Sequence, residues 1–170
     1  MWSAFLDRRA LGEVVDYLIV MTYDEHWAAS PVAGSVASLP WVEASMKRII
    51  EEDDVPGDKL ILGIPLYTRI WTEVEKEDGT IEVSSKSIGM TKAQEIIKEK
   101  KLKAKFSDDT GQNYVEYRED GARKRIWLED EKSLARRVEL AKDLDLAGIA
   151  TWNRSFASAN AWEVLRQITE

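Results

Sequence analysis

An apolar stretch near the start of the chain constrains the possible folds most. Residues 17–23 read Tyr-Leu-Ile-Val-Met-Thr-Tyr, a run rich in β-branched and aromatic residues without regular alternation of apolar and polar positions. Such a run is typical of a strand buried on both faces of a parallel sheet. Asp24 follows directly, and enzymes with parallel sheets place working groups at the carboxyl ends of their strands. Tyr23 and Asp24 are therefore candidate functional residues, although this stretch alone is equally consistent with Asp24 capping the loop while Tyr23 packs.

Two later stretches have the same character and alternate with helical patterns. Residues 59–67 and 146–152 predict a second and a third parallel strand. Between the first two strands, Ser38 can cap a helix that has Pro40 in its first turn. Strand, helix and strand in this order form a parallel crossover unit. Further amphipathic helices are predicted over residues 2–13, 131–143 and 161–168.

Residues 71–128 show a different pattern. Asp78-Gly79 lies between two alternating segments, which indicates a β-hairpin. Thr91 and Gln94 predict a capping box for a helix that continues to Lys100. Two further alternating strands are predicted over residues 113–118 and 123–128. Because the pattern changes from parallel crossover to antiparallel meander, we interpret this region as an inserted α+β lobe.

The predicted fold class is therefore α/β. Residues 1–70 and 129–170 supply the parallel strands with their helices, and residues 71–128 form the lobe. Periodicity does not distinguish part of an α/β barrel from part of an open sheet. A complete eight-stranded barrel typically takes about 250 residues, whereas this chain has 170.

Composition argues against several classes of partner. The chain has 24 basic and 31 acidic residues, a net charge of −7, and its basic residues are scattered. We therefore expect neither nucleic acid nor a membrane as a partner. The absence of cysteine excludes disulfides and thiolate metal sites, and we predict no metal site and no cofactor. No apolar run approaches the ~20 residues of a membrane helix, and the first residues lack the pattern of a signal sequence.

The ends of the three predicted parallel strands carry distinctive motifs. Residues 21–24 read Met-Thr-Tyr-Asp, residues 63–69 read Gly-Ile-Pro-Leu-Tyr-Thr-Arg, and residues 148–152 read Gly-Ile-Ala-Thr-Trp. In this order they resemble the ends of the sixth, seventh and eighth barrel strands of glycoside hydrolase family 18, the chitinase-like enzymes, which carry an inserted lobe after the seventh strand. The resemblance covers nearly the whole chain. The loops at residues 38–43 and 126–130 are most similar to the bacterial branch that acts on spore cortex or peptidoglycan.

This resemblance implies a partial (β/α)8 barrel, comprising strands six to eight, with an inserted lobe. It also implies substrate-assisted retaining hydrolysis, in which the 2-acetamido oxygen of the sugar attacks its own anomeric carbon. Tyr23 and Asp24 would be catalytic, the phenol donating to the acetamido oxygen and the carboxylate stabilising the positive charge. The implied substrate-binding residues are Met21, Trp27, Tyr67, Arg69 and Trp152. The implied partner is an N-acetylglucosamine-containing polysaccharide, either chitin or peptidoglycan, and the implied location is outside the cell, in the cell wall or in the spore.

One departure from the family is important. The catalytic signature Asp-x-x-Asp-x-Asp-x-Glu has no counterpart, because neither residues 53–58 nor Asp108-Asp109 has its spacing. The chain thus resembles the C-terminal part of such an enzyme without its general acid, whose loss typically costs about 10²–10⁴-fold in rate. We expect the isolated chain to be essentially inactive. We also expect the apolar edges of a partial barrel to drive homo-oligomerisation.

Three functional hypotheses remain at this stage: a portion of a glycoside hydrolase, a non-catalytic carbohydrate-binding module, and a scaffold for protein contacts. Simpler roles also exist for individual residues. Trp152 at the end of a buried strand could belong to the core, and Arg69 could pair with a loop glutamate. Met21 could pack beneath the cleft.

Overall fold

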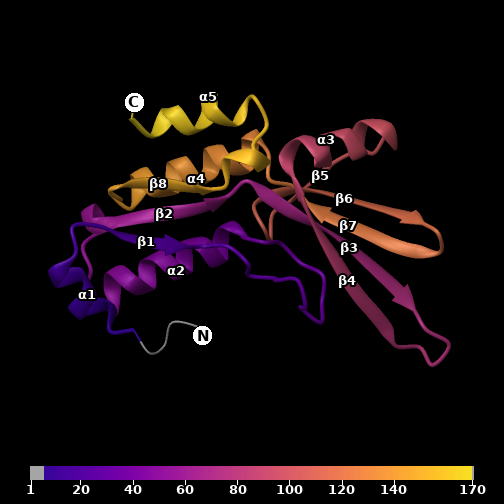
Figure 1. The fold of residues 1–170 in the computed structure, drawn as a ribbon, viewed down its shortest axis with the longest axis horizontal. Coiled ribbons are helices and arrows are strands. Elements are labelled where there is room, and N and C mark those ends of the chain that lie inside the picture. The colour runs from indigo at the N-terminus through magenta and orange to yellow at the C-terminus, as the bar shows by residue number, and fades with distance from the viewer. Residues whose placement is uncertain (1–5, 170) are drawn as a thin grey trace.

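The computed structural model describes residues 6–169 and confirms the α/β class. Residues 2–5 of the first predicted helix lie outside the described residues. A parallel sheet has the order β1 (Leu18–Met21), β2 (Leu60–Pro65) and β8 (Gly148–Trp152). An antiparallel sheet has the order β4 (Ile81–Gly89), β3 (Tyr67–Glu75), β7 (Ala122–Trp127), β6 (Gln112–Glu119) and β5 (Lys105–Ser107). In Figure 1 the parallel sheet with its helices occupies the left half, and the antiparallel sheet the right half.

Five α-helices are present in the described part of the chain. They are α1 (Arg8–Val14), α2 (Leu39–Glu51), α3 (Met90–Glu99), α4 (Glu131–Asp143) and α5 (Ala161–Leu165). Short 3-10 turns lie at Gly57–Lys59, Arg154–Phe156 and Arg166–Thr169. The helices predicted over residues 131–143 and 161–168 are confirmed, the second as α5 followed by a 3-10 turn.

The central strand β2 carries the core of the parallel sheet. Its residues Leu60, Leu62 and Ile64 are completely buried and belong to one cluster with side chains of α2, α4 and α5. Helix α2 contributes Met46 to this cluster, and α4 contributes Leu134. Burial of each large apolar side chain contributes on the order of 1.5–3 kcal/mol. The helix-covered face is therefore the stabilising face of this sheet.

The prediction that residues 17–23 form a strand buried on both faces is wrong. Strand β1 covers only Leu18–Met21, and its residues alternate between half-buried and exposed. Leu18 and Val20 pack against the helix-side core, whereas Ile19 is 57% exposed and Met21 69% exposed. The reason is that the core of the parallel sheet lies with α2, α4 and α5 on one face, and within residues 6–169 the other face of β1 stays open.

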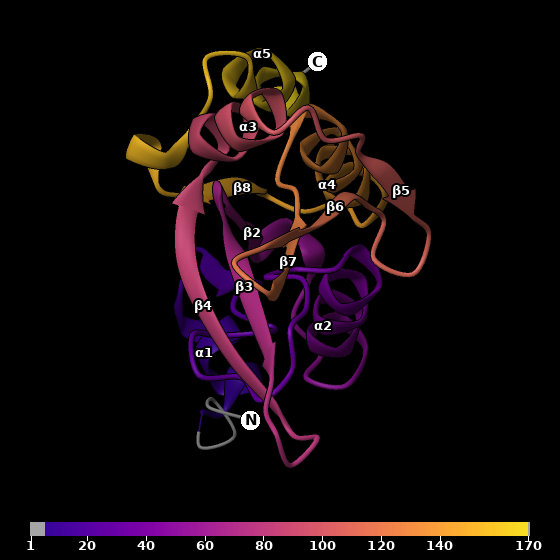
Figure 2. The same cartoon turned by 90° about the vertical axis from the view of Figure 1, so that its right-hand side faces the viewer.

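The antiparallel sheet contains the predicted hairpin. Strands β3 and β4 pair from Tyr67 with Gly89 to Glu75 with Ile81, and their hairpin extends well beyond the other strands (Figure 2). Gly79 in the turn has a φ of 80°, a conformation that glycine adopts without strain. Helix α3 covers one face of the sheet through a second apolar cluster, formed by Ile88, Ala93, Ile96, Val115, Ile126 and Leu128.

One predicted helix cap is wrong and another is only partly formed. Helix α3 begins at Met90 after Gly89, without a side-chain cap, so Thr91 and Gln94 form no capping box at its start. Ser38 occupies the predicted N-cap position of α2, but its side chain makes no capping hydrogen bond, because its hydroxyl donates to a Glu25 carboxylate oxygen at 3.0 Å. The missed strand β5 has only three residues, which is too short for a periodic pattern to reveal.

Candidate functional site

The carboxyl ends of the three parallel strands meet at one rim. Met21 of β1 is in register with Gly63 of β2, and Pro65 of β2 is in register with Trp152 of β8. The backbone N–H of Leu66 donates to the Trp152 carbonyl at 2.7 Å, so the chain leaves the parallel sheet beside β8. Tyr67 then begins the antiparallel sheet. The rim therefore lies at the junction of the two sheets.

A carboxylate, a phenol and a guanidinium converge at this rim. The Tyr67 hydroxyl donates to Asp24 Oδ1 at 2.7 Å, and Arg69 donates to the same oxygen at 3.3 Å. The Asp24 side chain is 45% exposed, while that of Arg69 is buried. Asp24 has a φ of 61°, a left-handed conformation that few residues other than glycine adopt. The fold thus holds Asp24 in an unusual backbone conformation with its carboxylate facing both its partners and solvent.

Two tyrosine rings form the apolar side of this arrangement. Tyr23 meets Tyr67 edge-on at 6.4 Å between ring centroids, and Phe156 lies 5.8 Å from Tyr67. Burial raises the pKa of Tyr67 well above its usual range, and its hydrogen bond to Asp24 raises it further. Burial and the charge of Asp24 also raise the pKa of Tyr23. Both phenols therefore stay protonated and can donate hydrogen bonds at neutral pH.

Arg69 does not pair with a loop glutamate, because its carboxylate partner is Asp24. Its Nη1 atom also lies 3.5 Å from the Ser85 hydroxyl, which donates to the carbonyl of Ala28 at 3.2 Å. The Nε atom of Arg69 is buried and has no hydrogen-bond partner among the described residues. Ser85 thus links the guanidinium to the loop that follows Asp24.

The remaining predicted site residues are exposed. Trp152 is 55% exposed, which contradicts its assignment to the core. The 69% exposure of Met21 likewise contradicts a role in packing beneath a cleft. Trp27 is 50% exposed and lies in the loop, where its backbone N–H donates to Ser30 Oγ at 2.9 Å. The structure therefore joins Tyr23, Asp24, Tyr67 and Arg69 by contacts, places Trp152 at the same rim through strand register, and connects Trp27 only through the loop.

Sequence reasoning missed Ser85 and Phe156. The position of Ser85 could have been predicted, because the Asp78-Gly79 turn sets the register of the hairpin and this register places Ser85 opposite Trp71. Phe156 lies in a 3-10 turn after β8. No local pattern marks such a position as part of a site.

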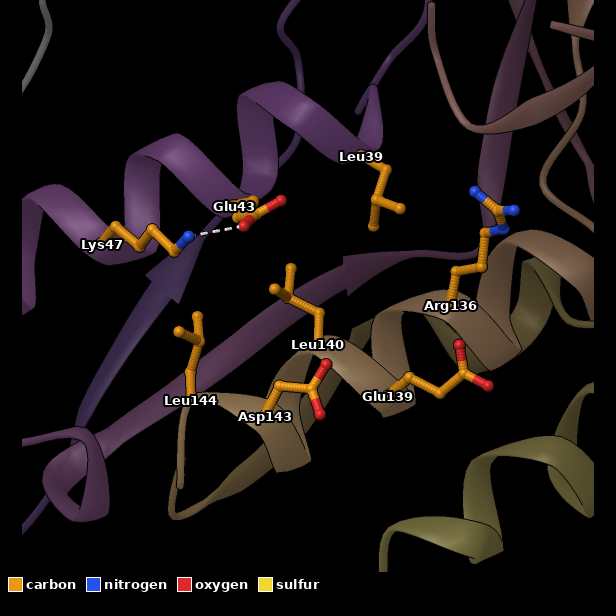
Figure 3. A pocket seen from close by; sticks show the side chains of 8 residues that line it. All are labelled: Leu39, Glu43, Lys47, Arg136, Glu139, Leu140, Asp143 and Leu144. Carbon is orange, nitrogen blue, oxygen red and sulfur yellow. Dashed lines mark ion pairs between the residues drawn. The ribbon is translucent and has the colours of Figure 1, made fainter. Parts of the chain in front are cut away.

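A groove in the described residues lies elsewhere. It has a volume of about 450 Å³ between α2 and α4, on the helix-covered side of the molecule (Figure 3). Its floor contains leucines, and Lys47 pairs with Glu43 at 2.7 Å on its rim. None of the candidate site residues lines it. The candidate site is thus separate from this groove.

Residues 6–169 contain neither a metal-binding cluster nor a membrane-spanning helix. No group of three or more histidine, cysteine, aspartate or glutamate side chains is arranged to hold a metal ion there. Within the same residues, every helix is too short or too polar to span a bilayer.

Comparison with known proteins agrees with the motifs at the rim. The family model for glycosyl hydrolases family 18 matches residues 2–157. The chain is 29% identical over 172 residues to the uncharacterized glycosylase YvbX of Bacillus subtilis (strain 168), covering 99% of this chain and 47% of YvbX. It is 25% identical over 165 residues to the cortical fragment-lytic enzyme of the same organism, covering 96% of this chain and 37% of that enzyme.

A solved structure supports the same relationship. The chitinase from Chromobacterium violaceum ATCC 12472 superposes with a TM-score of 0.80 at 25% identity, covering 95% of this chain and 48% of that chain. The chain thus spans less than half of the length of each of these relatives. Since the family model matches most of the chain, the chain belongs to family 18 of the glycosyl hydrolases.

Proposed function

We propose that this chain carries the acetamide-binding part of a glycoside hydrolase active site. The substrate class is an N-acetylglucosamine-containing polysaccharide, chitin or peptidoglycan, and the reaction is substrate-assisted retaining hydrolysis. The observation that carries the proposal is the junction at which Asp24 Oδ1 accepts from Tyr67 at 2.7 Å and from Arg69 at 3.3 Å. Membership of family 18 and the similarity to chitinases support it.

The chemistry needs groups that orient the acetamide and stabilise positive charge. When the acetamido oxygen attacks C1, the bond from C1 to the leaving oxygen breaks and an oxazolinium ion forms. The Tyr23 hydroxyl donates to the acetamido group, and the Asp24 carboxylate faces the charge that develops on it. Tyr67 and Arg69 hold that carboxylate in place, so little reorganisation is needed during the reaction. Trp152, Met21 and Trp27 offer exposed apolar surface to the sugar rings.

The leaving oxygen also needs a proton, and the chain lacks the acidic signature that supplies it in the family. We therefore expect the isolated chain to bind the sugar without hydrolysing it at a significant rate. The same residues would also suit a carbohydrate-binding module that does not cut its ligand. The exposed Trp27 and Trp152, which suit sugar binding whether or not the bond is cut, favour this second candidate.

The partial-barrel interpretation belongs to the same proposal. In it, β1, β2 and β8 are the sixth, seventh and eighth strands of a (β/α)8 barrel, and the five-stranded sheet with α3 is the inserted lobe. The relatives support this interpretation, because each is more than twice as long as the part that this chain matches. The similarity to a cortical fragment-lytic enzyme supports action on the spore or cell wall.

Calorimetric titration with N-acetylglucosamine oligomers tests the proposal. Wild-type chain should bind them and should not bind cello-oligosaccharides of the same length, which lack the acetamide. Asp24→Asn and Trp152→Ala should each weaken binding about tenfold or more, because they remove a charge partner and a ring platform. Trp162→Ala is the matched control, since Trp162 is also partly exposed but lines a separate groove. Equal binding of both sugars, or equal losses in the Trp162 variant, would contradict the proposal.

A further inference from the structure

The loop between β1 and α2, residues 25–38, is held by side chains from distant parts of the chain. The indole N–H of Trp71 donates to the carbonyl of Gly34 at 2.8 Å. Ser85 donates to the carbonyl of Ala28 at 3.2 Å, and Arg137 donates to the carbonyl of Ala37. These donors come from β3, β4 and α4. The conformation of the loop is therefore set by the antiparallel sheet and by α4.

A chain of buried polar groups forms the strongest of these connections. The Ser35 hydroxyl donates to Gln112 Oε1, and Gln112 Nε2 donates to Glu129 Oε1 at 2.8 Å. Glu129 forms a two-pronged ion pair with Arg137, with both N–O distances at 2.9 Å. Arg137 also donates a hydrogen bond to the carbonyl of Ala37, which lies in the loop. We call Ser35, Gln112, Glu129 and Arg137 the buried relay, and none of the four is more than 3% exposed.

Stability alone is a poor explanation for the buried relay. Removing two charges from water costs energy that their attraction often does not recover, and apolar side chains of similar size are often equally stabilising. A buried network of hydrogen bonds instead selects one arrangement of the groups that it joins. Here the joined groups come from the loop, β6, the segment before α4, and α4 itself. The relay therefore selects one position of the loop relative to the rest of the molecule.

Backbone hydrogen bonds within the loop connect the relay to the candidate site. The N–H of Glu25 donates to the carbonyl of Val36 at 2.8 Å, and the N–H of His26 donates to the carbonyl of Ser35 at 3.2 Å. The His26 ring nitrogen Nδ1 also lies 2.8 Å from that Ser35 carbonyl. Asp24 directly precedes the paired residues and Trp27 directly follows them. Fixing Ser35 thus fixes both ends of the segment that carries Asp24 and Trp27.

We propose that the buried relay is a set of positioning residues for the sugar site. In this view the inserted lobe, through Gln112, holds the loop so that Asp24 and Trp27 face the substrate. The proposal rests on the function proposed above for the role of Asp24. Its structural part, that the relay sets the position of residues 24–27, is independent of that function.

Two relay variants test the proposal. Gln112→Met keeps the length of the side chain and removes its hydrogen bonds. Ser35→Ala removes the hydrogen bond from the loop to Gln112 and leaves the buried ion pair and the contact of Arg137 with Ala37 intact. In each, amide hydrogen exchange at Glu25 and His26 should accelerate about tenfold or more, since their backbone pairing loses its anchor. Affinity for N-acetylglucosamine oligomers should fall about tenfold in parallel. Ser35→Ala keeps the test usable if Gln112→Met does not fold.

Two control variants separate positioning from general destabilisation. Arg125→Met removes a two-pronged ion pair with Glu73 inside the lobe that does not touch the loop. Leu134→Ala removes buried volume from α4. Both should lower the thermal midpoint without a selective change at Glu25 and His26. Exchange at these two amides that is unchanged in both relay variants, or that rises equally in the controls, would overturn the proposal.

The two proposals fail in different ways. If wild-type chain binds no N-acetylglucosamine oligomer, the sugar site is wrong, yet the exchange measurement still decides whether the relay positions the loop. If wild-type chain binds and the relay variants bind equally well, the sugar site stands and the positioning role is wrong.

Discussion

The two faces of the parallel sheet are built from the same kinds of residue but have opposite environments. On one face, Leu62 of β2 is completely buried under the helices. On the other, Ile19, Met21 and Trp152 are all more than half exposed. The first face holds the fold together, and the second carries the rim with Asp24. The difference shows that an apolar run can serve stability on one side of a strand and stay available for binding or association on the other.

The largest expected effect is a difference between the two faces in how much a truncated side chain lowers the free energy of unfolding. Leu62→Ala should lower the free energy of unfolding by about 2–5 kcal/mol, because it leaves a cavity in a packed core. Ile19→Ala should change it by no more than about 0.5 kcal/mol, because the residue is exposed. Urea denaturation of both variants measures the difference. Similar losses in the two variants would mean that the open face is covered in solution.

Association should also depend on the open face. We expect the wild-type chain to form dimers or larger species as its concentration rises, because apolar side chains and unpaired strand edges favour contacts between copies. Met21→Lys should shift this equilibrium toward the monomer, as judged by light scattering. Ile81→Lys is the control, because Ile81 is also more than half exposed but lies next to the turn of the β3–β4 hairpin. A wild-type chain that stays monomeric at high concentration would rule out this expectation.

A smaller effect separates the two tyrosines at the rim. Tyr67→Phe should cost about 1 kcal/mol of stability, because it removes the hydrogen bond to Asp24. Tyr23→Phe should leave stability nearly unchanged while weakening the binding of N-acetylglucosamine oligomers, since its proposed partner is the sugar. Thermal unfolding and calorimetry on the two variants measure both quantities. A stability loss in Tyr23→Phe as large as in Tyr67→Phe would argue for a structural role of Tyr23.

A different kind of effect concerns the pH dependence of stability. Burial raises the pKa of Glu129 from 4.5 to about 7, although the charge of Arg137 opposes the shift and Asp130 adds to it. The folded chain then holds a proton that the unfolded chain releases between these pH values, so stability should fall as pH rises through this window. Midway through this window nearly one whole proton separates the folded and unfolded states, so the slope should approach about 1.4 kcal/mol per pH unit. The free energy of unfolding of the Glu129→Gln variant should not show this decrease with pH. If the wild-type chain instead becomes more stable than the variant as pH rises, the assignment to Glu129 is wrong.

The elements that follow from local pattern were predictable. Helix α4 has the predicted bounds, and the Asp78-Gly79 turn closes the predicted hairpin. In both cases neighbouring residues decide the outcome, through the period of apolar positions and the φ that glycine allows. The convergence of Asp24 and Tyr67 was also predictable, because parallel strands end at a common edge and the motifs lie at those ends.

The features that were missed depend on groups far apart in the chain. Ser38 looked like a helix cap, yet its hydroxyl donates to Glu25. Nothing in the local sequence of Gln112 or Arg137 indicates that they meet Ser35 and Ala37. Such contacts arise only when the lobe folds against the loop, so a pattern within a short window carries no signal for them.

The order and type of most elements, the family, and the strand ends at which candidate site residues gather all follow from the amino-acid sequence. They do so because periodicity, turn chemistry and motif spacing are local properties of the chain. Which face of β1 is covered, and how the loop that carries Trp27 is held, became visible only in the folded molecule. Burial depends on which elements pack above a strand, and the same run of Ile19, Val20 and Met21 would suit a strand covered on one face or on both.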